Sequence, residues 1–384
     1  MSHHNTVFAQ LLKLVPRHQF ETLAKQHHVG RKFRKTSRWS QFVALTMGQL
    51  SGRHSLRDVI ANAAAQTSCW YHLGARRITR STLARVNEKQ PHEFYESLFG
   101  TLYQRCRPKA PGHKFRFKNP LYSIDSSLID LSLKIFPWGH FALGKAAVKL
   151  HVGLDHRGYL PAFATITDSH TADIKVARTL ALPKGSMVVC DKGYDDYSWF
   201  TALTDKGIYF ITRQKRDARY RVAERRPVNR SQGLICDQTI ELTGQKSRKE
   251  KLARLRRIAY RDPETRIRYV FLTNNFKLAA STIAACYKER WQIELFFKWI
   301  KQNLKIKAFL GTSKNAVMTQ IWIALCVYLM LAYLKYLSKI RPSMQQMIRL
   351  LQLNLFARRD LLALLCADPP KPQPPSLQVQ LAFT

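Results

Sequence analysis

The spacing of apolar residues changes its period near residue 115, and this change limits the folds open to the chain more than any other feature. Before it, "NTVFAQLLKLV", "SRWSQFVALTMGQL" and "SLRDVIANAAAQ" carry apolar residues at helical spacing, with Ser55 and Ser81 as expected N-caps. After it, "LYSIDSSLIDLSL" and "KLHVGLDHRGYLPAFATITD" predict three strands, and the pattern continues as helix, strand, helix and strand. This order predicts an α/β fold with a mixed sheet, preceded by an all-helical N-terminal domain.

A cation-dense segment interrupts the α/β pattern. Residues 213–276 combine runs such as "RQKRDARYRVAERR" with the strand-like stretches "QTIEL", "RRIAY" and "RYVFLTN", which predicts a basic, mostly β insertion. A long helix is expected to begin at about residue 278, and the tail "PPKPQPP" is expected to be extended or disordered. We therefore expect five segments: a basic helical domain at 1–110, the first part of the α/β domain at 115–212, the insertion at 213–276, the completion of the α/β domain at 277–340, and a C-terminal helix with a Pro-rich tail at 341–384.

The excess of basic residues indicates a polyanionic partner. Lys plus Arg number 63 against 25 Asp plus Glu, which gives the 384-residue chain a net charge of +38. An enzyme of small metabolites has no use for this self-repulsion, whereas nucleic acid releases counterions when its phosphates are neutralised. An anionic membrane and ribosomal RNA are the second and third alternatives. Near the N-terminus "GRKFRKTSRW" favours contact with DNA, the alternative being a solvated charge run.

The stretch "AVMTQIWIALCVYLMLAYLK" at 316–335 is nearly long enough to span a bilayer. Because it contains Thr319 and Gln320 and closely follows a basic helix, we expect a buried core helix and no membrane. No basic segment followed by a long apolar one marks a signal peptide at the N-terminus. Seven cysteines without a CxxC pair predict neither a zinc site nor a disulfide framework, and so a reducing compartment.

The stretch "YKERWQIELFFKWIK" at 287–301 gathers polar residues on one side of the predicted helix. At about 100° per residue, four of them fall within about 60° of one another: Tyr287, Arg290, Glu294 and Lys301. Leu295, Phe296 and Trp299 lie away from this stripe and are expected to pack on a core. The alternative for the stripe is a solvated face with one i,i+4 ion pair, worth a few tenths of a kcal/mol.

Three carboxylates are expected to meet at one edge of the sheet. Asp125 lies within the first predicted strand, and Asp191 follows the strand "MVVC", where Gly193 permits a tight turn. The helix that carries Glu294 could bring a third carboxylate over this edge. Three carboxylates at one point are tolerated when a divalent cation neutralises them, and oxygen ligands suit Mg²⁺, with Mn²⁺ as the alternative. Such a site can hydrolyse or transfer a phosphodiester.

Each acid also has a purely structural explanation. Asp125 could cap a turn beside Ser126, and Asp191 could stabilise the N-terminus of a following helix. Four other acids are candidates for the same catalytic role: Asp130, Asp155, Asp168 and Asp173. Of these, Asp155 is typical of a turn and Asp173 of the start of a helix.

The spacing of Tyr287, Arg290, Glu294 and Lys301 is the Y-x2-R-x3-E-x6-K signature without deviation. The chain therefore resembles the DDE transposases of the insertion-sequence-four family. "DKGY" at 191–194 is similar to the D-x-G-[FY] motif of that family, and "SIDSS" is similar to the region of its first aspartate. The resemblance covers about residues 115–335, and residues 1–110 are similar, more weakly, to the helical region often joined to such catalytic domains.

The resemblance implies a ribonuclease-H-like catalytic domain with a mostly β insertion between Asp191 and Glu294. The implied catalytic residues and Mg²⁺ ligands are Asp125, Asp191 and Glu294. The implied reaction is cut-and-paste movement of an insertion sequence through a hairpin intermediate. The N-terminal domain would bind DNA ends, and two protomers would form the synaptic complex in the bacterial cytoplasm, at the nucleoid.

The resemblance also implies DNA contacts on and near the signature helix: Tyr287, Arg290, Lys298 and Lys301. Trp291 is the expected platform for a flipped base, with core packing as its alternative, and a second aromatic would have to come from Tyr260, Tyr269 or Phe276. Other functions remain open: a regulator that binds ends without cutting, a ribonuclease-H-like nuclease without strand transfer, and a structural RNA-binding protein.

Overall fold

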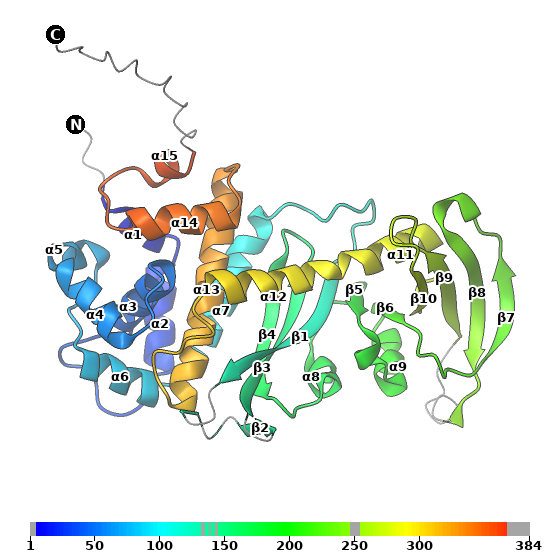
Figure 1. Ribbon diagram of the computed structural model, residues 1–384, viewed down its shortest axis with the longest axis horizontal. Coiled ribbons are helices and arrows are strands. Elements are labelled where there is room, and N and C mark those ends of the chain that lie inside the picture. Colours follow the sequence, from blue (N-terminus) through cyan, green and yellow to red (C-terminus); the bar gives the residue numbers. More distant parts are fainter. Residues whose placement is uncertain are drawn as a thin grey trace, which may run out of the picture.

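A helical part and a long sheet lie side by side in the computed structural model (Figure 1). The structure describes residues 5–131, 135–136, 138, 140–142, 145–245 and 254–366. The expected Pro-rich tail lies outside these residues.

Ten strands of the described residues form one continuous sheet, in the order β2-β3-β1-β5-β6-β10-β9-β8-β7, with β4 also paired to β3. The strands are β1 (Leu121–Leu131), β2 (His140–Ala142), β3 (Lys145–Asp155), β4 (Leu160–Asp168), β5 (Met187–Cys190), β6 (Tyr209–Arg213), β7 (Tyr220–Arg226), β8 (Leu234–Leu242), β9 (Leu255–Arg261) and β10 (Arg268–Thr273). β1 is antiparallel to β3 and parallel to β5, and β5 is parallel to β6, so the predicted mixed sheet is confirmed.

The basic segment extends this sheet and does not form a separate one. β10 pairs antiparallel with β6, and β9, β8 and β7 follow outward. The strands expected at "QTIEL", "RRIAY" and "RYVFLTN" are confirmed as β8, β9 and β10, whereas β7 lies in a run that sequence analysis described only as cationic.

Helices cover both faces of the sheet. α8 (Asp173–Thr179) and α9 (Tyr197–Asp205) pack with Val188 and Cys190 of β5 in one apolar cluster. α11 (Ala280–Glu289) packs with Met187 and Val189 in another. Because successive side chains of a strand point to opposite faces, α8 and α9 lie on one face and α11 on the other. α12 (Trp291–Asn303) continues from α11 and crosses β1 (Figure 1).

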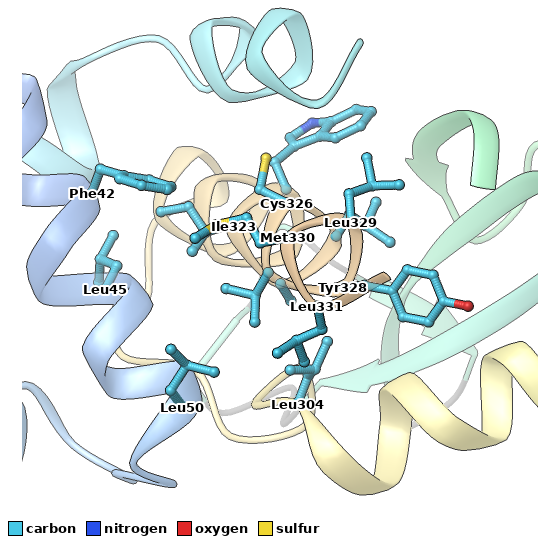
Figure 2. Packing of buried hydrophobic residues seen from close by; sticks show 14 of the residues in the cluster. Phe42, Leu45, Leu50, Leu304, Ile323, Cys326, Tyr328, Leu329, Met330 and Leu331 are labelled. Atoms are coloured by element: carbon cyan, nitrogen blue, oxygen red, sulfur yellow. The ribbon is translucent and has the colours of Figure 1, made fainter. Parts of the chain in front are cut away.

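A helical part surrounds one long helix, α13 (Lys314–Ser338). The other elements of this part are α1 (Val7–Leu12), α2 (Arg17–Gln26), α3 (Arg38–Leu50), α4 (Leu56–Ala65), α5 (Thr67–Trp70), η1 (Tyr71–Leu73), α6 (Arg80–Lys89), α7 (Glu93–Cys106), η2 (Arg107–Lys109), α14 (Met344–Asn354) and α15 (Leu361–Cys366). α13 contacts α3, α6 and α7, and Figure 2 shows its apolar side chains meeting those of α3. The C-terminal helices thus return to the N-terminal ones, which join both ends of the described chain in one core.

α13 contains the apolar stretch that sequence analysis weighed as a membrane span. It is the only helix in the described part of the chain that is long and apolar enough to cross a bilayer, and 94% of its most apolar window is buried within the structure. The expectation of a buried core helix is confirmed. Of the two expected N-caps, Ser55 caps α4, but the expectation for Ser81 is wrong because the Thr79 side chain caps α6.

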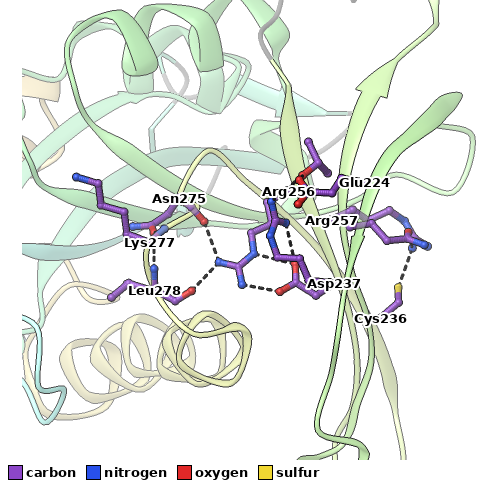
Figure 3. Close-up of polar contacts among 11 residues, drawn as sticks. Glu224, Cys236, Asp237, Arg256, Arg257, Asn275, Lys277 and Leu278 are labelled. Carbon is purple, nitrogen blue, oxygen red and sulfur yellow. Dashed lines mark hydrogen bonds and ion pairs between the residues drawn. The ribbon is translucent and has the colours of Figure 1, made fainter.

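A buried ion pair ties the basic segment to the entry of α11 (Figure 3). The Arg256 guanidinium donates to both oxygens of Asp237, at 2.8 and 2.6 Å, and both side chains are 5% exposed. The same guanidinium donates to the backbone oxygens of Asn275 and Leu278, just before α11. β8, β9 and the entry to α11 are therefore held as one unit.

Candidate active site

Two aspartates are placed together by the parallel pairing of β1 and β5. Ile124 of β1 is the register partner of Cys190 of β5. Asp125, within β1, and Asp191, directly after β5, are the next residues along the two strands, so they lie at the same level of the sheet. The expectation that the two aspartates come from neighbouring strands agrees with this pairing.

The junction of α11 and α12 brings the third acid to these aspartates. Arg290 Nη1 donates to Asp125 Oδ2 at 3.3 Å, and its Nη2 donates to Glu294 Oε1 at 2.7 Å. The Tyr287 hydroxyl donates to Asp191 Oδ1 at 3.4 Å. The three carboxylates therefore converge on the side chains of Arg290 and Tyr287.

The expectation of one unbroken helix through this region is wrong. α11 ends at Glu289 and α12 begins at Trp291, with Arg290 between them. The amide of Arg290 donates to the Tyr287 oxygen and the amide of Ile293 to the Arg290 oxygen, so this turn closes over three residues and not four. The polar stripe nevertheless faces β1 and the end of β5, because Tyr287 bonds to Asp191, Arg290 to Asp125 and Lys301 to Ser127. α11 and α12 follow each other without a sharp change of direction (Figure 1).

The outer side of α12 is more exposed than the sequence indicated. Phe296 is buried as expected and Trp299 is half-buried, but Leu295 is 41% exposed, so its expected core packing is wrong. Trp291 is 56% exposed, which rules out the core-packing alternative for this side chain. The exposed side of α12 therefore lies next to Glu294 and includes the indole of Trp291.

Burial dominates the electrostatics of the first aspartate. Desolvation raises the pKa of Asp125 to about 6, opposed by a hydrogen bond from the Ser126 amide and by the charge of Arg290. The negative charges of Glu294 and Asp191 are smaller contributions to the same rise. The three carboxylates are therefore close enough to repel one another.

The donor set fits an oxygen-liganded divalent ion in its chemistry. No group of three or more His, Cys, Asp or Glu side chains stands at metal-binding distance among the described residues. The Arg290 guanidinium lies between Asp125 and Glu294, at 3.3 and 2.7 Å, and provides a positive charge to both. A metal would have to take the place of this cation between the two acids.

The two lysines of the signature region differ in their contacts. Lys301 Nζ donates to Ser127 Oγ and to the Leu128 oxygen of β1, both at 2.7 Å. Burial lowers its pKa, against the opposing charge of Asp130. Lys298 is exposed and makes no hydrogen bond or ion pair with a described residue.

Sequence analysis missed a polar group behind Asp125. Ser126 Oγ donates to Asp173 Oδ1 at 2.8 Å, and Lys149 Nζ and His151 Nδ1 lie 3.3 and 3.5 Å from the same oxygen. Asp173 is the first residue of α8, as its helix-start pattern predicted. Its contact with the neighbour of Asp125 had no signal in the sequence, because 47 positions separate the two residues.

The other candidate acids are engaged elsewhere. Asp155 accepts from Arg107 at 3.2 Å and from the amide two residues on, which confirms its role at a turn. Asp168 accepts from the amide and hydroxyl of Thr171. Asp130 is exposed at the far end of β1.

An aromatic pocket of about 340 Å³ adjoins the three carboxylates. It is lined by cationic and aromatic side chains, among them Arg213, Tyr260, Tyr269, Tyr287, Arg290 and Trp291. Tyr260 and Tyr269 are register partners on β9 and β10, so they project from the same face of the sheet. Phe276 lies elsewhere, with the Arg226 guanidinium 5.4 Å from its ring.

The family model described as a transposase DDE domain matches residues 117–330, more than half of the chain. This chain belongs to the DDE transposases. A second model, described as a domain of unknown function (DUF4372), matches residues 3–76 of the transposase.

Relatives of the transposase carry matching names. The "Putative transposase y4zB" of Sinorhizobium fredii is 33% identical over 77% of this chain and 81% of its own length. The "Probable transposase for insertion sequence element IS5377" of Geobacillus stearothermophilus is 29% identical over 68% of each chain. The "Putative transposase for insertion sequence element IS4SA" of Synechocystis is 23% identical over 60% of this chain and 65% of its own.

These matches confirm the resemblance to insertion-sequence-four transposases and the ribonuclease-H-like fold with a helical N-terminal region. The transposase is thus an enzyme that acts on DNA. Membership of the DDE class also implies dependence on a divalent metal ion.

Proposed function

We propose that the transposase moves an insertion sequence by cut-and-paste transposition, with Asp125, Asp191 and Glu294 as its catalytic residues. The observation that supports this most strongly is that the three carboxylates, from β1, the end of β5 and α12, converge on two neighbouring side chains of one helix junction. Arg290 donates to Asp125 and Glu294, and Tyr287 donates to Asp191. Acids with only structural roles have no reason to meet from three elements, and the pKa of Asp125, raised to about 6 chiefly by burial and in part by the two other acids, is typical of a functional site.

The same three carboxylates would hold Mg²⁺, with Mn²⁺ as the alternative. When bound, such an ion would activate the attacking oxygen and stabilise the leaving oxygen of a phosphodiester. Arg290 would then leave the carboxylates and donate its two terminal nitrogens to a phosphate, for which a guanidinium has matching geometry.

The remaining polar residues of the signature helices would position the DNA. Tyr287, hydrogen-bonded to Asp191, would direct its hydroxyl at a phosphate oxygen beside the scissile bond. Lys298 is exposed and unpaired among the described residues, so it is available to the backbone. Lys301 would reach a phosphate by exchanging one of its two hydrogen bonds to β1.

The chemistry would proceed by in-line phosphoryl transfers at one site. Water attacks the phosphodiester at the element end and releases a 3′-hydroxyl. That hydroxyl attacks the opposite strand, which forms a hairpin and releases the flanking DNA. A second water opens the hairpin, and the 3′ ends then attack target DNA.

The aromatic pocket beside the carboxylates supports the hairpin step. A hairpin strains the stacking of the last base pairs of the DNA. A base that leaves this stack needs an aromatic side chain on which to stack instead. Trp291 offers an exposed indole at the mouth of the pocket, and Tyr260 and Tyr269 line its wall. These tyrosines, not Phe276, are the second aromatic surface that we propose.

Transposition of this kind brings two ends together, so we propose a homodimer in the synaptic complex with element ends and target DNA. The transposase would work in the bacterial cytoplasm at the nucleoid, without a membrane, and its net charge of +38 would favour DNA.

The test is a cleavage assay with DNA that carries the inverted repeats flanking the coding region. With Mg²⁺, the wild type should give nicked, hairpin and joined products. Asp125→Asn, Asp191→Asn and Glu294→Gln should each abolish all of them while binding to end DNA is retained. Asp168→Asn, in a turn away from the site, is the matched control and should cut normally.

Each alternative function gives a different result. Binding without any product from the wild type would favour an end-binding regulator. Nicks without hairpin or joined strands would favour a nuclease. Normal cleavage by Glu294→Gln would show that Glu294 is not a catalytic residue. RNA binding that is the same in Glu294→Gln and the wild type would favour a structural RNA-binding protein.

A further inference from the structure

We infer that a groove at the tip of the insertion binds the phosphate backbone of the DNA whose end lies in the active site of the same chain. The groove, of about 560 Å³, is lined by four arginines: Arg230, Arg261, Arg266 and Arg268. The assignment of this DNA rests on the proposed function.

Two chain connections meet to form the groove. One joins β7 to β8 through η5 (Arg230–Gln232) and Gly233, and the other joins β9 to β10. Gly233 has φ +78°, and a Cβ there would lie 2.3 Å from the Arg261 oxygen, so only glycine lets the connections approach this closely. The Arg261 amide donates to the Gly233 oxygen at 2.8 Å, which fixes the two connections to each other.

The positive charge of the groove has no partner within the described chain. All four arginines are exposed, and none of their side chains makes an ion pair or hydrogen bond with a residue that the structure describes. The acids of the β9–β10 connection are committed elsewhere, because Lys288 Nζ lies 3.4 Å from Asp262 and 2.8 Å from Glu264.

Two of the arginines stand directly opposite each other. Arg261 and Arg268 are register partners at the ends of β9 and β10. Like charges in this position destabilise a sheet. Two other exposed arginines of the insertion are neutralised, since Arg221 and Arg254 share Glu241. An uncompensated cluster in a groove is what a bound polyanion requires, and guanidinium groups match phosphate geometry.

The groove and the aromatic pocket lie on opposite faces of the same strand pair. Tyr260 and Tyr269 line the pocket, and Arg261 and Arg268 are the next residues on each strand, so they project from the other face. The β9–β10 connection itself borders both, through Thr265 in the pocket and its arginines in the groove. DNA whose end lies at the pocket would therefore reach the groove by passing around the β9–β10 connection.

The test measures how binding of the full-length chain depends on salt. The probes are a duplex with the inverted repeat that flanks the coding region and a duplex of equal length with scrambled sequence. For Arg261→Gln/Arg268→Gln on the repeat duplex, the slope of log affinity against log salt should fall in magnitude by about two units. Between 50 and 200 mM salt, a fourfold change, the wild type should thus lose about sixteenfold more affinity than the variant.

The matched control is Arg221→Gln/Arg254→Gln, which removes two exposed arginines of the same insertion that already share an acid. Its slope should stay close to that of the wild type. The melting temperature of Arg261→Gln/Arg268→Gln should be unchanged or raised, because a like-charge pair is removed. If that variant does not fold, Arg266→Gln should lower the slope by about one unit.

Other results would overturn the inference. An unchanged slope, or an equal change in the control, would show that the groove does not hold phosphates. A change confined to the scrambled duplex would assign the groove to other DNA. If the wild type binds with the expected slopes but never cuts, the proposed function fails and the groove stands. If the wild type cuts DNA but the salt slopes of the wild type and Arg261→Gln/Arg268→Gln are equal, the inference about the groove is wrong and the proposed function is unaffected.

Discussion

Arg290 is the cation that joins two of the three active-site acids, so the substitution Arg290→Gln tests the electrostatics of the site. Its guanidinium is 14% exposed, and the carboxylates of Asp125 and Glu294 are 24% and 34% exposed. These contacts are neither fully buried nor at the surface, and hydrogen bonds to charged groups contribute about 1.5–3 kcal/mol. Without metal, Arg290→Gln should lower the free energy of unfolding by about this amount.

Mg²⁺ should offset the loss of stability caused by Arg290→Gln. Because Arg290 occupies the carboxylates that a metal needs, the wild type must break its two ion pairs before it can bind the ion. The variant has no such cost, so its affinity for Mg²⁺ should be about 10–100-fold higher, at about 1.4 kcal/mol for each factor of ten. The assay is the melting temperature against Mg²⁺ concentration, since a ligand of the folded state stabilises it by RT ln(1 + [L]/Kd).

Two controls separate this effect from a general one. Arg221→Gln removes an exposed ion pair with Glu241, and its response to Mg²⁺ should equal that of the wild type. The double variant Arg290→Gln/Asp125→Asn should lose the added response. The same Mg²⁺ dependence in the wild type and Arg290→Gln would refute the reasoning, because Arg290 would then not share the acids with a metal.

Three further predictions concern other parts of the fold. Arg256→Ala should lower the free energy of unfolding by about 3–5 kcal/mol, since it leaves a buried carboxylate unpaired, whereas Arg254→Ala, at an exposed pair, should cost under about 1 kcal/mol in the same urea titration. Gly153→Ala should cost about 1–3 kcal/mol, because the added Cβ would lie 1.6 Å from the Phe163 ring, and Phe163→Ala should suppress this cost in the double variant. Trp291→Ala should allow the first nick but reduce hairpin formation, with Trp291→Phe partly active; equal hairpin yield on a gel would remove the indole from this step.

The two aspartates could be predicted because each depends on local patterns. Strand alternation placed Asp125 in β1, and the end of an apolar run placed Asp191 after β5. The parallel register that makes them neighbours follows from the strand-helix-strand order. Glu294 was predicted from its spacing to Tyr287 and Arg290. The three side chains still share one side, although the helix is interrupted at Arg290.

The break at Arg290 could not be predicted, since neither proline nor glycine marks it. The side chain of Arg290 is held by Asp125, 165 positions away, and such a contact leaves no local pattern. The exposure of Leu295 has a similar origin, because a helical wheel shows which residues share a face but not how closely other elements pack against that face.

The strand β7 was missed for a different reason. It is an edge strand whose residues are mostly exposed, so cations such as Arg221 and Arg225 replace the apolar alternation. Charged side chains on an edge are a common protection against unwanted pairing. Continuity of the insertion with the main sheet depends on pairing β10 with β6, about 60 residues earlier in the chain, which also lies beyond local patterns.

Binding of Mn²⁺ to the full-length transposase with end DNA, followed by electron paramagnetic resonance, tests most directly whether the three carboxylates form one metal site. The wild type should bind the ion, and Asp125→Asn, Asp191→Asn and Glu294→Gln should each lose it, while Asp168→Asn retains it. Undiminished Mn²⁺ binding in any of the three active-site variants would contradict a shared site for these carboxylates.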